Sequence, residues 1–187
     1  VRRTEAFCWR FCDDYLELVK GRAYRDDAAA VSARAALHVA LSTLLRLFAP
    51  FLPFVTEEVW SWCRTDGGGV AGFEAPSVHL ATWPTASELR ARITDEPCAD
   101  GGDSSLVVAA EVLGRIRKAK SDAKVSMRAD VATVTVVDTH DRLAALAAAS
   151  SDVCDAGKVA SLETVALAAG AEASIDVVLA EVVADPA

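Results

Sequence analysis

The sequence predicts a mainly α fold, in which an antiparallel helical bundle is followed by a small α+β unit. Alanine and leucine, the strongest helix formers, dominate residues 28–48, and the leucines of this stretch fall on one side of a helix. After Met127 the residue pattern changes, and apolar and polar residues alternate over residues 129–138 (ADVATVTVVD), as in a half-buried strand. A chain of 187 residues is long enough for one domain with a smaller second one.

We expect the bundle to occupy residues 1–128, to be truncated at its N-terminus, and to carry a loop-rich insert over residues 65–103. The α+β unit is expected over residues 129–187, in the order strand, helix, strand, strand. In the insert, TDGGGVAG indicates a flexible turn and not a phosphate-binding loop, because it lacks the GxxxxGK[ST] pattern. DEPCADGGDSS indicates an acidic linker. Helices of the bundle are expected over residues 2–24, 28–48, from Pro53 or Thr56 onward, and 104–123.

The segment RLFAPFLPFVTEEVW, residues 46–60, predicts a helix–helix corner. Pro50 ends one helix, and Pro53 is tolerated at the start of the next. Glu57 and Glu58 are expected in the first turn, where acids complement the helix dipole; adjacent residues point to different sides and cannot share a substrate. The core of the corner is expected to consist of Phe51, Leu52, Phe54 and Val55, with Trp60 facing inward.

The composition narrows the functional class. A formal net charge of −8 argues against a protein that coats nucleic acid non-specifically, but it is compatible with a local basic face. Five cysteines without a CxxC pair indicate reduced cytosolic thiols, and Cys8 and Cys12, one helical turn apart, are expected to be buried rather than to bind a metal. No uncharged apolar run approaches 18 residues, so no membrane span is expected.

Four stretches in this order resemble a known family: FCDDYLELVKGRAY, LLRLFAPFLPFVTEEVW, VHLATWP and LGRIRKAKSDAKVSM. Together they are similar to the C-terminal region of the valyl-tRNA synthetases, which are class I aminoacyl-tRNA synthetases, and the similarity covers most of residues 2–130. The proline-rich corner is shared with the isoleucyl and leucyl relatives, so it identifies the subclass rather than the amino acid.

The resemblance implies that the helical bundle is an anticodon-binding domain, with the anticodon arm of tRNA(Val) and the upstream catalytic domain of the same cytoplasmic enzyme as partners. The parent enzymes use ATP and magnesium to activate valine and transfer it to tRNA. The 187 residues contain neither the HIGH-type nor the KMSKS-type ATP motif, so we expect no catalytic residue, metal site or cofactor in this chain and no activity of the chain alone. The C-terminal sequence lacks heptads, so a coiled-coil arm is not expected either.

Contacts to RNA require cations for phosphates and flat side chains for unpaired bases. The expected tRNA-binding residues are Lys20, Arg22, Tyr24 and Arg25 near the end of the first helix, and Arg117, Lys120 and Lys124, which the helical spacing places on one face of a later helix. Arg10 and Arg34 are second choices, and Trp9 and Trp62 are expected in the core. For each cation the alternative is an ordinary solvated surface charge.

Two alternatives remain open at this point. The equivalent region of an isoleucyl-tRNA synthetase shares the corner motif, although that family usually adds a C-terminal zinc-binding cysteine cluster that this sequence lacks. A helical protein-interaction domain without an RNA role would need no more than the acidic surface.

Overall fold

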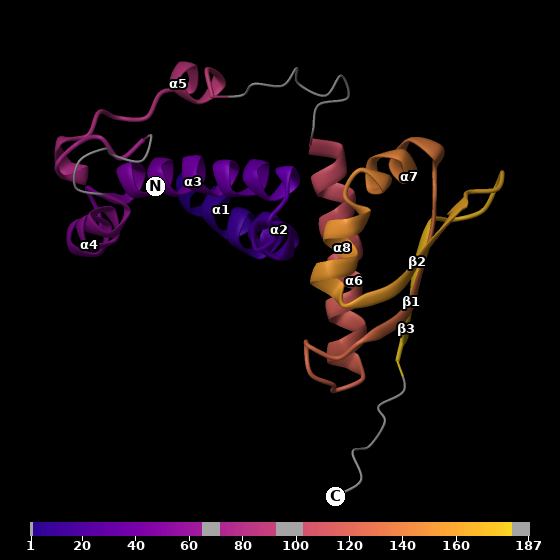
Figure 1. Ribbon diagram of the computed structural model, residues 1–187. Coiled ribbons are helices and arrows are strands. Elements are labelled where there is room, and N and C mark those ends of the chain that lie inside the picture. The colour runs from indigo at the N-terminus through magenta and orange to yellow at the C-terminus, as the bar shows by residue number, and fades with distance from the viewer. Residues whose placement is uncertain (1, 65–71, 93–102, 181–187) are drawn as a thin grey trace, which may run out of the picture. The chain divides into compact units, whose positions relative to one another are not determined.

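The computed structural model describes residues 2–64, 72–92 and 103–180, which form helices and one small sheet (Figure 1). Most of the predicted flexible turn and acidic linker, residues 65–71 and 95–102, lies outside the described residues. The expected fold class is confirmed, because helices predominate and a three-stranded sheet follows them in sequence. The chain divides into two compact units, Val1–Phe11 with Asp26–Glu96, and Cys12–Arg25 with Pro97–Ala187.

The long helix predicted at residues 2–24 is observed as three consecutive segments. They are α1 (Arg2–Arg10), a π-helical segment η1 (Phe11–Leu16) and α2 (Glu17–Ala23). Asp26-Asp27 breaks the helical pattern as expected, and the Asp27 side chain caps the next helix by accepting a hydrogen bond of 2.7 Å from the backbone N–H of Ala30.

The first unit is built on α3 (Ala28–Phe48) and α4 (Pro53–Cys63), with a 3₁₀ turn η2 (Val78–Leu80) and a short helix α5 (Ala86–Arg90). Trp60 is 1% exposed, as predicted, and its indole Nε1 donates to the Ala75 carbonyl oxygen at 3.0 Å. Its ring lies 4.6 Å from that of Phe73, between centroids. The same core contains Leu45, Ala49 and Val78.

The corner between α3 and α4 differs from the prediction. Phe54 is 90% exposed, and the apolar side chains around it, Phe51, Leu52 and Val55, are exposed as well. For Phe54 and Val55 the reason is the helical phase: α4 begins at Pro53 and turns Thr56 and Trp60 toward the core, so these two side chains face away from it. Phe51 and Leu52 lie in the turn before the helix.

The paired glutamates of the corner are not in the first turn of α4, because the helix begins four residues before the first of them. Glu57 instead accepts hydrogen bonds from the Ser77 hydroxyl at 2.7 Å and from the Val78 N–H at 3.0 Å. Glu58 accepts from the Trp62 indole at 3.1 Å. Their observed role is thus to bond a neighbouring segment and a neighbouring side chain, not to cap a helix.

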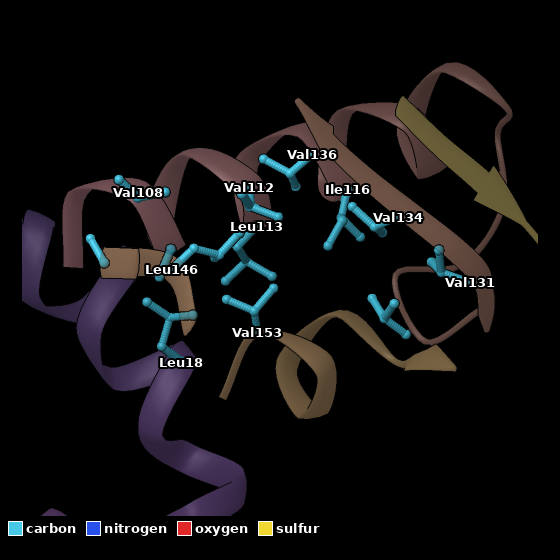
Figure 2. Packing of buried hydrophobic residues seen from close by; sticks show 13 residues of the cluster. Leu18, Val108, Val112, Leu113, Ile116, Val131, Val134, Val136, Leu146 and Val153 are labelled. Carbon is cyan, nitrogen blue, oxygen red and sulfur yellow. The ribbon is translucent and has the colours of Figure 1, made fainter. Parts of the chain in front are cut away.

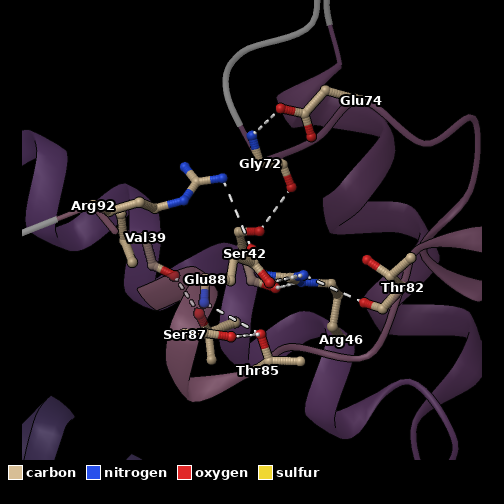
Figure 3. Close-up of polar contacts among 11 residues, drawn as sticks. Val39, Ser42, Arg46, Gly72, Glu74, Thr82, Thr85, Ser87, Glu88 and Arg92 are labelled. Carbon is tan, nitrogen blue, oxygen red and sulfur yellow. Dashed lines mark hydrogen bonds and ion pairs between the residues drawn. The ribbon is translucent and has the colours of Figure 1, made fainter. Parts of the chain in front are cut away.

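Arg46 joins α3 to the segment that contains η2 and α5 (Figure 3). Its side chain is buried, and its guanidinium bonds both carboxylate oxygens of Glu88, at 2.8 and 3.1 Å, and the Thr82 carbonyl at 3.3 Å. Ser42, one turn earlier, donates to the Gly72 carbonyl at 2.7 Å. Hydrogen bonds from α3 therefore hold both ends of residues 72–88, which contain the turn η2.

By length and composition, α3 could also cross a membrane, since its most apolar window has a mean hydropathy of 1.5. This helix carries Arg34 and Arg46, so it is not an uncharged run of the kind sought in the sequence, and the expectation of no membrane span stays a prediction. The core helix of a soluble protein passes the same test, so one candidate helix is weak evidence of a membrane span.

The second unit packs α2 and three further helices, α6 (Asp103–Asp122), α7 (His140–Ala147) and α8 (Ser150–Gly157), with a sheet. The strands β1 (Val131–Asp138), β2 (Val159–Ala166) and β3 (Ser174–Leu179) lie in the order β2-β1-β3. β1 is parallel to β2 and antiparallel to β3. The expected order of strand, helix, strand, strand is observed, with the predicted helix divided into α7 and α8.

The core of this unit lies between α6 and β1 (Figure 2). Val112 and Ile116 of α6 and Val134 and Val136 of β1 are all fully buried, and Leu18 of α2 packs into the same cluster. In this unit α2 packs against α8, and α6 packs against α7, α8 and β3. The domain division expected at residue 128 stays a prediction.

Candidate nucleic-acid interface

The first group of expected contact residues lies on α2 and just after it, where α2 packs against α8 of the same unit. Lys20 is exposed, and its Nζ lies 3.4 Å from Glu17 Oε1. Tyr24, the residue that follows α2, is 86% exposed. These two side chains are open to a large ligand.

The two arginines of this group are held by carboxylates of α8. Arg22 Nη2 lies 3.2 Å from Asp152 Oδ2. Arg25 forms an ion pair with Asp155 and also donates to the Ser151 hydroxyl at 3.2 Å. Because both guanidinium groups already have protein acceptors, the basic patch predicted from the sequence is largely neutralised in the fold.

Burial changes the titration of two acidic groups near the α2–α8 contact, Asp152 on α8 and Tyr15 on η1, just before α2. Burial raises the pKa of the Asp152 carboxyl, although Arg22 and Arg25 act in the opposite direction. Burial also raises the pKa of the Tyr15 phenol, against the effect of Arg22. Desolvation is the larger effect at both groups, as expected for ionisable side chains that pack inside a helix–helix contact.

The second expected group, on α6, does not form one exposed face. Arg117 donates to the Asp13 carbonyl at 3.0 Å and lies 3.8 Å from Glu17. Lys124 is exposed but follows the end of the helix, with φ of 55°. Lys120 is 1% exposed, so the expectation that it contacts RNA is wrong: its position on α6 points it into the unit rather than toward solvent.

Lys120 has a structural role instead. Its ammonium group donates to the carbonyl oxygens of Met127, at 3.1 Å, and Gly157, at 2.8 Å. Burial lowers the pKa of this lysine, and nearby Lys158 lowers it further while Asp130 raises it. The buried charge thus joins the segment after α6 to the end of α8.

Aromatic side chains expected in the core are found at the surface. Trp9 is 64% exposed and Trp62 is 69% exposed, so the expectation that they are buried is wrong. The cause for Trp62 is the same helical phase that exposes Phe54, since Trp60 occupies the core-facing side of α4. Of the second-choice cations, Arg10 and Arg34 are both exposed.

The cysteines that the structure describes form no disulfide with one another and are half-buried: Cys8, Cys12, Cys63 and Cys154. Burial raises the pKa of the Cys63 and Cys154 thiols, which favours the unreactive protonated form. Within the described ranges, no group of three or more His, Cys, Asp or Glu side chains could hold a metal ion.

Two exposed cations, Arg128 and Lys158, were not singled out from the sequence. Each directly follows a residue whose carbonyl is bonded by Lys120. They are thirty positions apart in the chain, so no local spacing signals that they belong to one place. The buried lysine that connects them is visible only in the fold.

Comparison with known proteins relates the chain to one family. A family model described as the anticodon-binding domain of tRNA ligase matches residues 1–136. The valine–tRNA ligase of Thermobifida fusca is 51% identical over 164 residues, which is 87% of this chain and 17% of that protein. That of Salinispora tropica is 51% identical over 172 residues, 86% of this chain and 19% of that protein.

A third valine–tRNA ligase, from Leifsonia xyli, is 41% identical over 187 residues, which is 97% of this chain and 19% of that protein. The chain thus spans less than one fifth of the length of these relatives. The resemblance to the valyl-tRNA synthetases that the four sequence stretches indicated is confirmed over most of the chain. The chain therefore belongs to the anticodon-binding domain family of the tRNA ligases.

Proposed function

We propose that this chain recognises the anticodon arm of tRNA(Val) as part of a valine–tRNA ligase. The observation that carries the proposal is the match of residues 1–136 to the anticodon-binding domain model, combined with 51% identity to two valine–tRNA ligases. The longer enzyme would activate valine with ATP and transfer it to tRNA(Val) in the cytoplasm. In it, the chain would supply tRNA binding next to an upstream catalytic domain, without a membrane partner.

The exposed side chains on α2 support a direct contact with RNA. Tyr24, just after α2, presents a flat ring at 86% exposure and lies four positions after exposed Lys20 in the chain. An aromatic ring can stack on an unpaired base while a cation binds phosphate. Arg25 could bind phosphate only with the part of its side chain that the ion pair to Asp155 leaves exposed. Arg22 would contribute by fixing this end of α2 to α8. Arg117 and Lys124 are proposed as secondary phosphate contacts; Lys120 is not, because it is buried.

Gel-shift measurements with three RNA transcripts would test this proposal: tRNA(Val), tRNA(Ile), and tRNA(Val) carrying an isoleucine anticodon. We expect the 187-residue chain to prefer tRNA(Val) and to lose the preference when the anticodon is exchanged. A preference for tRNA(Ile) would assign the chain to an isoleucine enzyme. Absence of binding to all three would favour a protein-interaction role and refute the proposal.

Tyr24→Ala and Tyr24→Phe form a matched pair for the stacking contact. Loss of the ring should cost about 1–3 kcal/mol of binding, the usual value for one base–aromatic stack, whereas phenylalanine should retain most of it. Equal losses for both variants would contradict stacking and indicate that the hydroxyl group makes the contact.

A further inference from the structure

One end of the second unit brings together two chain segments that each follow a helix. α6 ends at Asp122 and α8 ends at Gly157. Lys120, inside the unit, bonds the Met127 carbonyl of one segment and the Gly157 carbonyl of the other. A single ammonium group therefore holds residues 123–130 beside residues 157–159 (Figure 1 shows the chain turning from α6 back to β1).

Three cations lie on these two segments, and all three are exposed: Lys124, Arg128 and Lys158. Among the residues that the structure describes, none of the three side chains forms an ion pair. The segments 123–130 and 157–159 together contain these three cations and one acid, Asp130, so the two segments carry a net positive charge. This contrasts with Arg22, which already has a carboxylate partner.

The backbone at two of these positions is unusual. Lys124 and Lys158 have φ of 55° and 56°, a left-handed conformation that favours glycine, and no other non-glycine residue in the described ranges has positive φ. Lys124 is the left-handed residue of a helix C-cap in which Val125 N–H bonds the Lys120 carbonyl at 3.0 Å. The sequence thus carries a lysine at each helix end where glycine would be less strained.

A helix C-terminus attracts positive charge, and this accounts in part for the two lysines. It does not account for Arg128, which lies outside both helices. Nor are the exposed cations needed to satisfy the Met127 and Gly157 carbonyls, because buried Lys120 already bonds both. The three exposed charges are therefore left available to a ligand.

We infer that Lys124, Arg128 and Lys158 form a contact for the phosphate backbone of RNA, with Lys120 as the residue that positions it. The inference rests on the proposed function, and it adds Arg128 and Lys158 to the contact surface. Cations that bind phosphates set affinity and register without reading bases. The contribution of this contact to RNA affinity should therefore grow with the number of phosphates bound and should depend little on the anticodon sequence.

The test compares two double variants that remove the same charge. Arg128→Gln with Lys158→Asn changes the proposed contact, and asparagine is chosen because it tolerates a left-handed backbone. Arg115→Gln with Lys118→Gln changes two exposed cations on α6 and is the matched control. Binding of the 187-residue chain to the tRNA(Val) transcript is measured from 50 to 300 mM KCl, at a temperature where circular dichroism shows every variant folded.

We expect the first double variant to lower the slope of log K against log salt by about 1.5, since each phosphate contact contributes a little under one unit, and the control to leave the slope unchanged. Equal changes in both, or no change in either, would overturn the inference while leaving the proposed function intact. If the unmodified chain fails to bind tRNA at all, the proposed function fails first and this inference with it.

Lys120→Met tests the positioning role. Although Lys120 cannot reach a ligand, its loss should reduce the slope in the otherwise unmodified chain and should cause no further reduction when Arg128 and Lys158 have already been replaced. A purely structural effect would weaken binding equally in both backgrounds. That outcome would refute the positioning role of Lys120.

Discussion

Arg46 on α3 and Glu88 on α5 are joined by two hydrogen bonds, with Nη2–Oε1 at 2.8 Å and Nη1–Oε2 at 3.1 Å. The Arg46 side chain is 7% exposed and that of Glu88 is 28% exposed. Charge-assisted, two-point pairs of this kind specify geometry as well as energy. In the first unit this pair fixes α5 against α3, forty-two positions earlier in the chain.

Glu88→Gln should therefore destabilise the first unit. The change removes the charge that compensates buried Arg46, and leaving such a charge unpaired should cost on the order of 2–3 kcal/mol of unfolding free energy. Urea unfolding followed by tryptophan fluorescence would report it, since Trp60 lies in this unit. Glu58→Gln, at an exposed position on α4, is the control and should change the unfolding free energy by less than about 0.5 kcal/mol. Similar values for the two would show that the ion pair is dispensable.

Trp60→Ala should cost about 3–5 kcal/mol of unfolding free energy, because it empties a fully buried aromatic site and removes the bond to Ala75. Phe54→Ala, on the opposite side of the same helix, should cost less than about 0.5 kcal/mol. Far-UV circular dichroism during denaturant titration measures both. A larger loss for Phe54→Ala would mean that the exposed side of α4 is covered in solution.

The pair Asp138–Arg142 should make the second unit sensitive to acid. Asp138 is 6% exposed; burial alone would raise its pKa, but hydrogen bonds from Arg142, at 2.6 Å, and from the Thr139 N–H, at 2.7 Å, more than offset this and lower it. Because the folded pKa lies below the unfolded value of about 3.9, the stabilising contribution is present above pH 4 and is lost as pH falls through the folded value.

Thermal unfolding of Asp138→Asn across pH 2.5 to 7 tests this. The variant should be less stable than the original chain at pH 7, and the difference should shrink steadily below about pH 4. Asp176→Asn on β3 serves as the control, because Asp176 forms no ion pair among the described residues. A difference between variant and original chain that persists unchanged at pH 2.5 would show that the loss at Asp138 is not electrostatic.

Lys120→Met should lower the unfolding free energy of the second unit by about 2–4 kcal/mol. The methionine fills a similar volume but leaves the buried Gly157 carbonyl and the partly buried Met127 carbonyl without their donor. Lys118→Met, two residues earlier on the exposed side of α6, should have little effect. Hydrogen exchange at the backbone amides of residues 123–130 would localise the loss, and unchanged protection there would contradict the bonding role of Lys120.

The isolated chain should not catalyse valine-dependent exchange of pyrophosphate into ATP, because its 187 residues contain neither ATP-binding motif of the parent enzymes. A longer protein carrying the upstream catalytic domain provides the positive control. Exchange above background by the purified chain alone would refute this expectation.

The sequence by itself predicted the main helices, the order strand, helix, strand, strand along the chain, and the family. Helix ends at Phe48 and Pro53 follow from proline geometry, and the change from helical to alternating periodicity after Met127 marks the sheet. These signals are local, because they depend on residues a few positions apart, and the four family stretches can be read in the same way. The burial of Trp60 was predicted for the same reason.

Only the tertiary structure decided which charges and aromatic rings reach the surface. The sequence places Lys120 on a helical stripe with Arg117, yet Lys120 is buried where it bonds the Met127 and Gly157 carbonyls, and Arg117 is partly exposed. The acids that neutralise Arg22 and Arg25 lie about 130 positions away on α8. Coulombic and hydrogen-bond partners at such separations carry no local pattern, so the candidate contact surface could be assigned only after the fold brought them together.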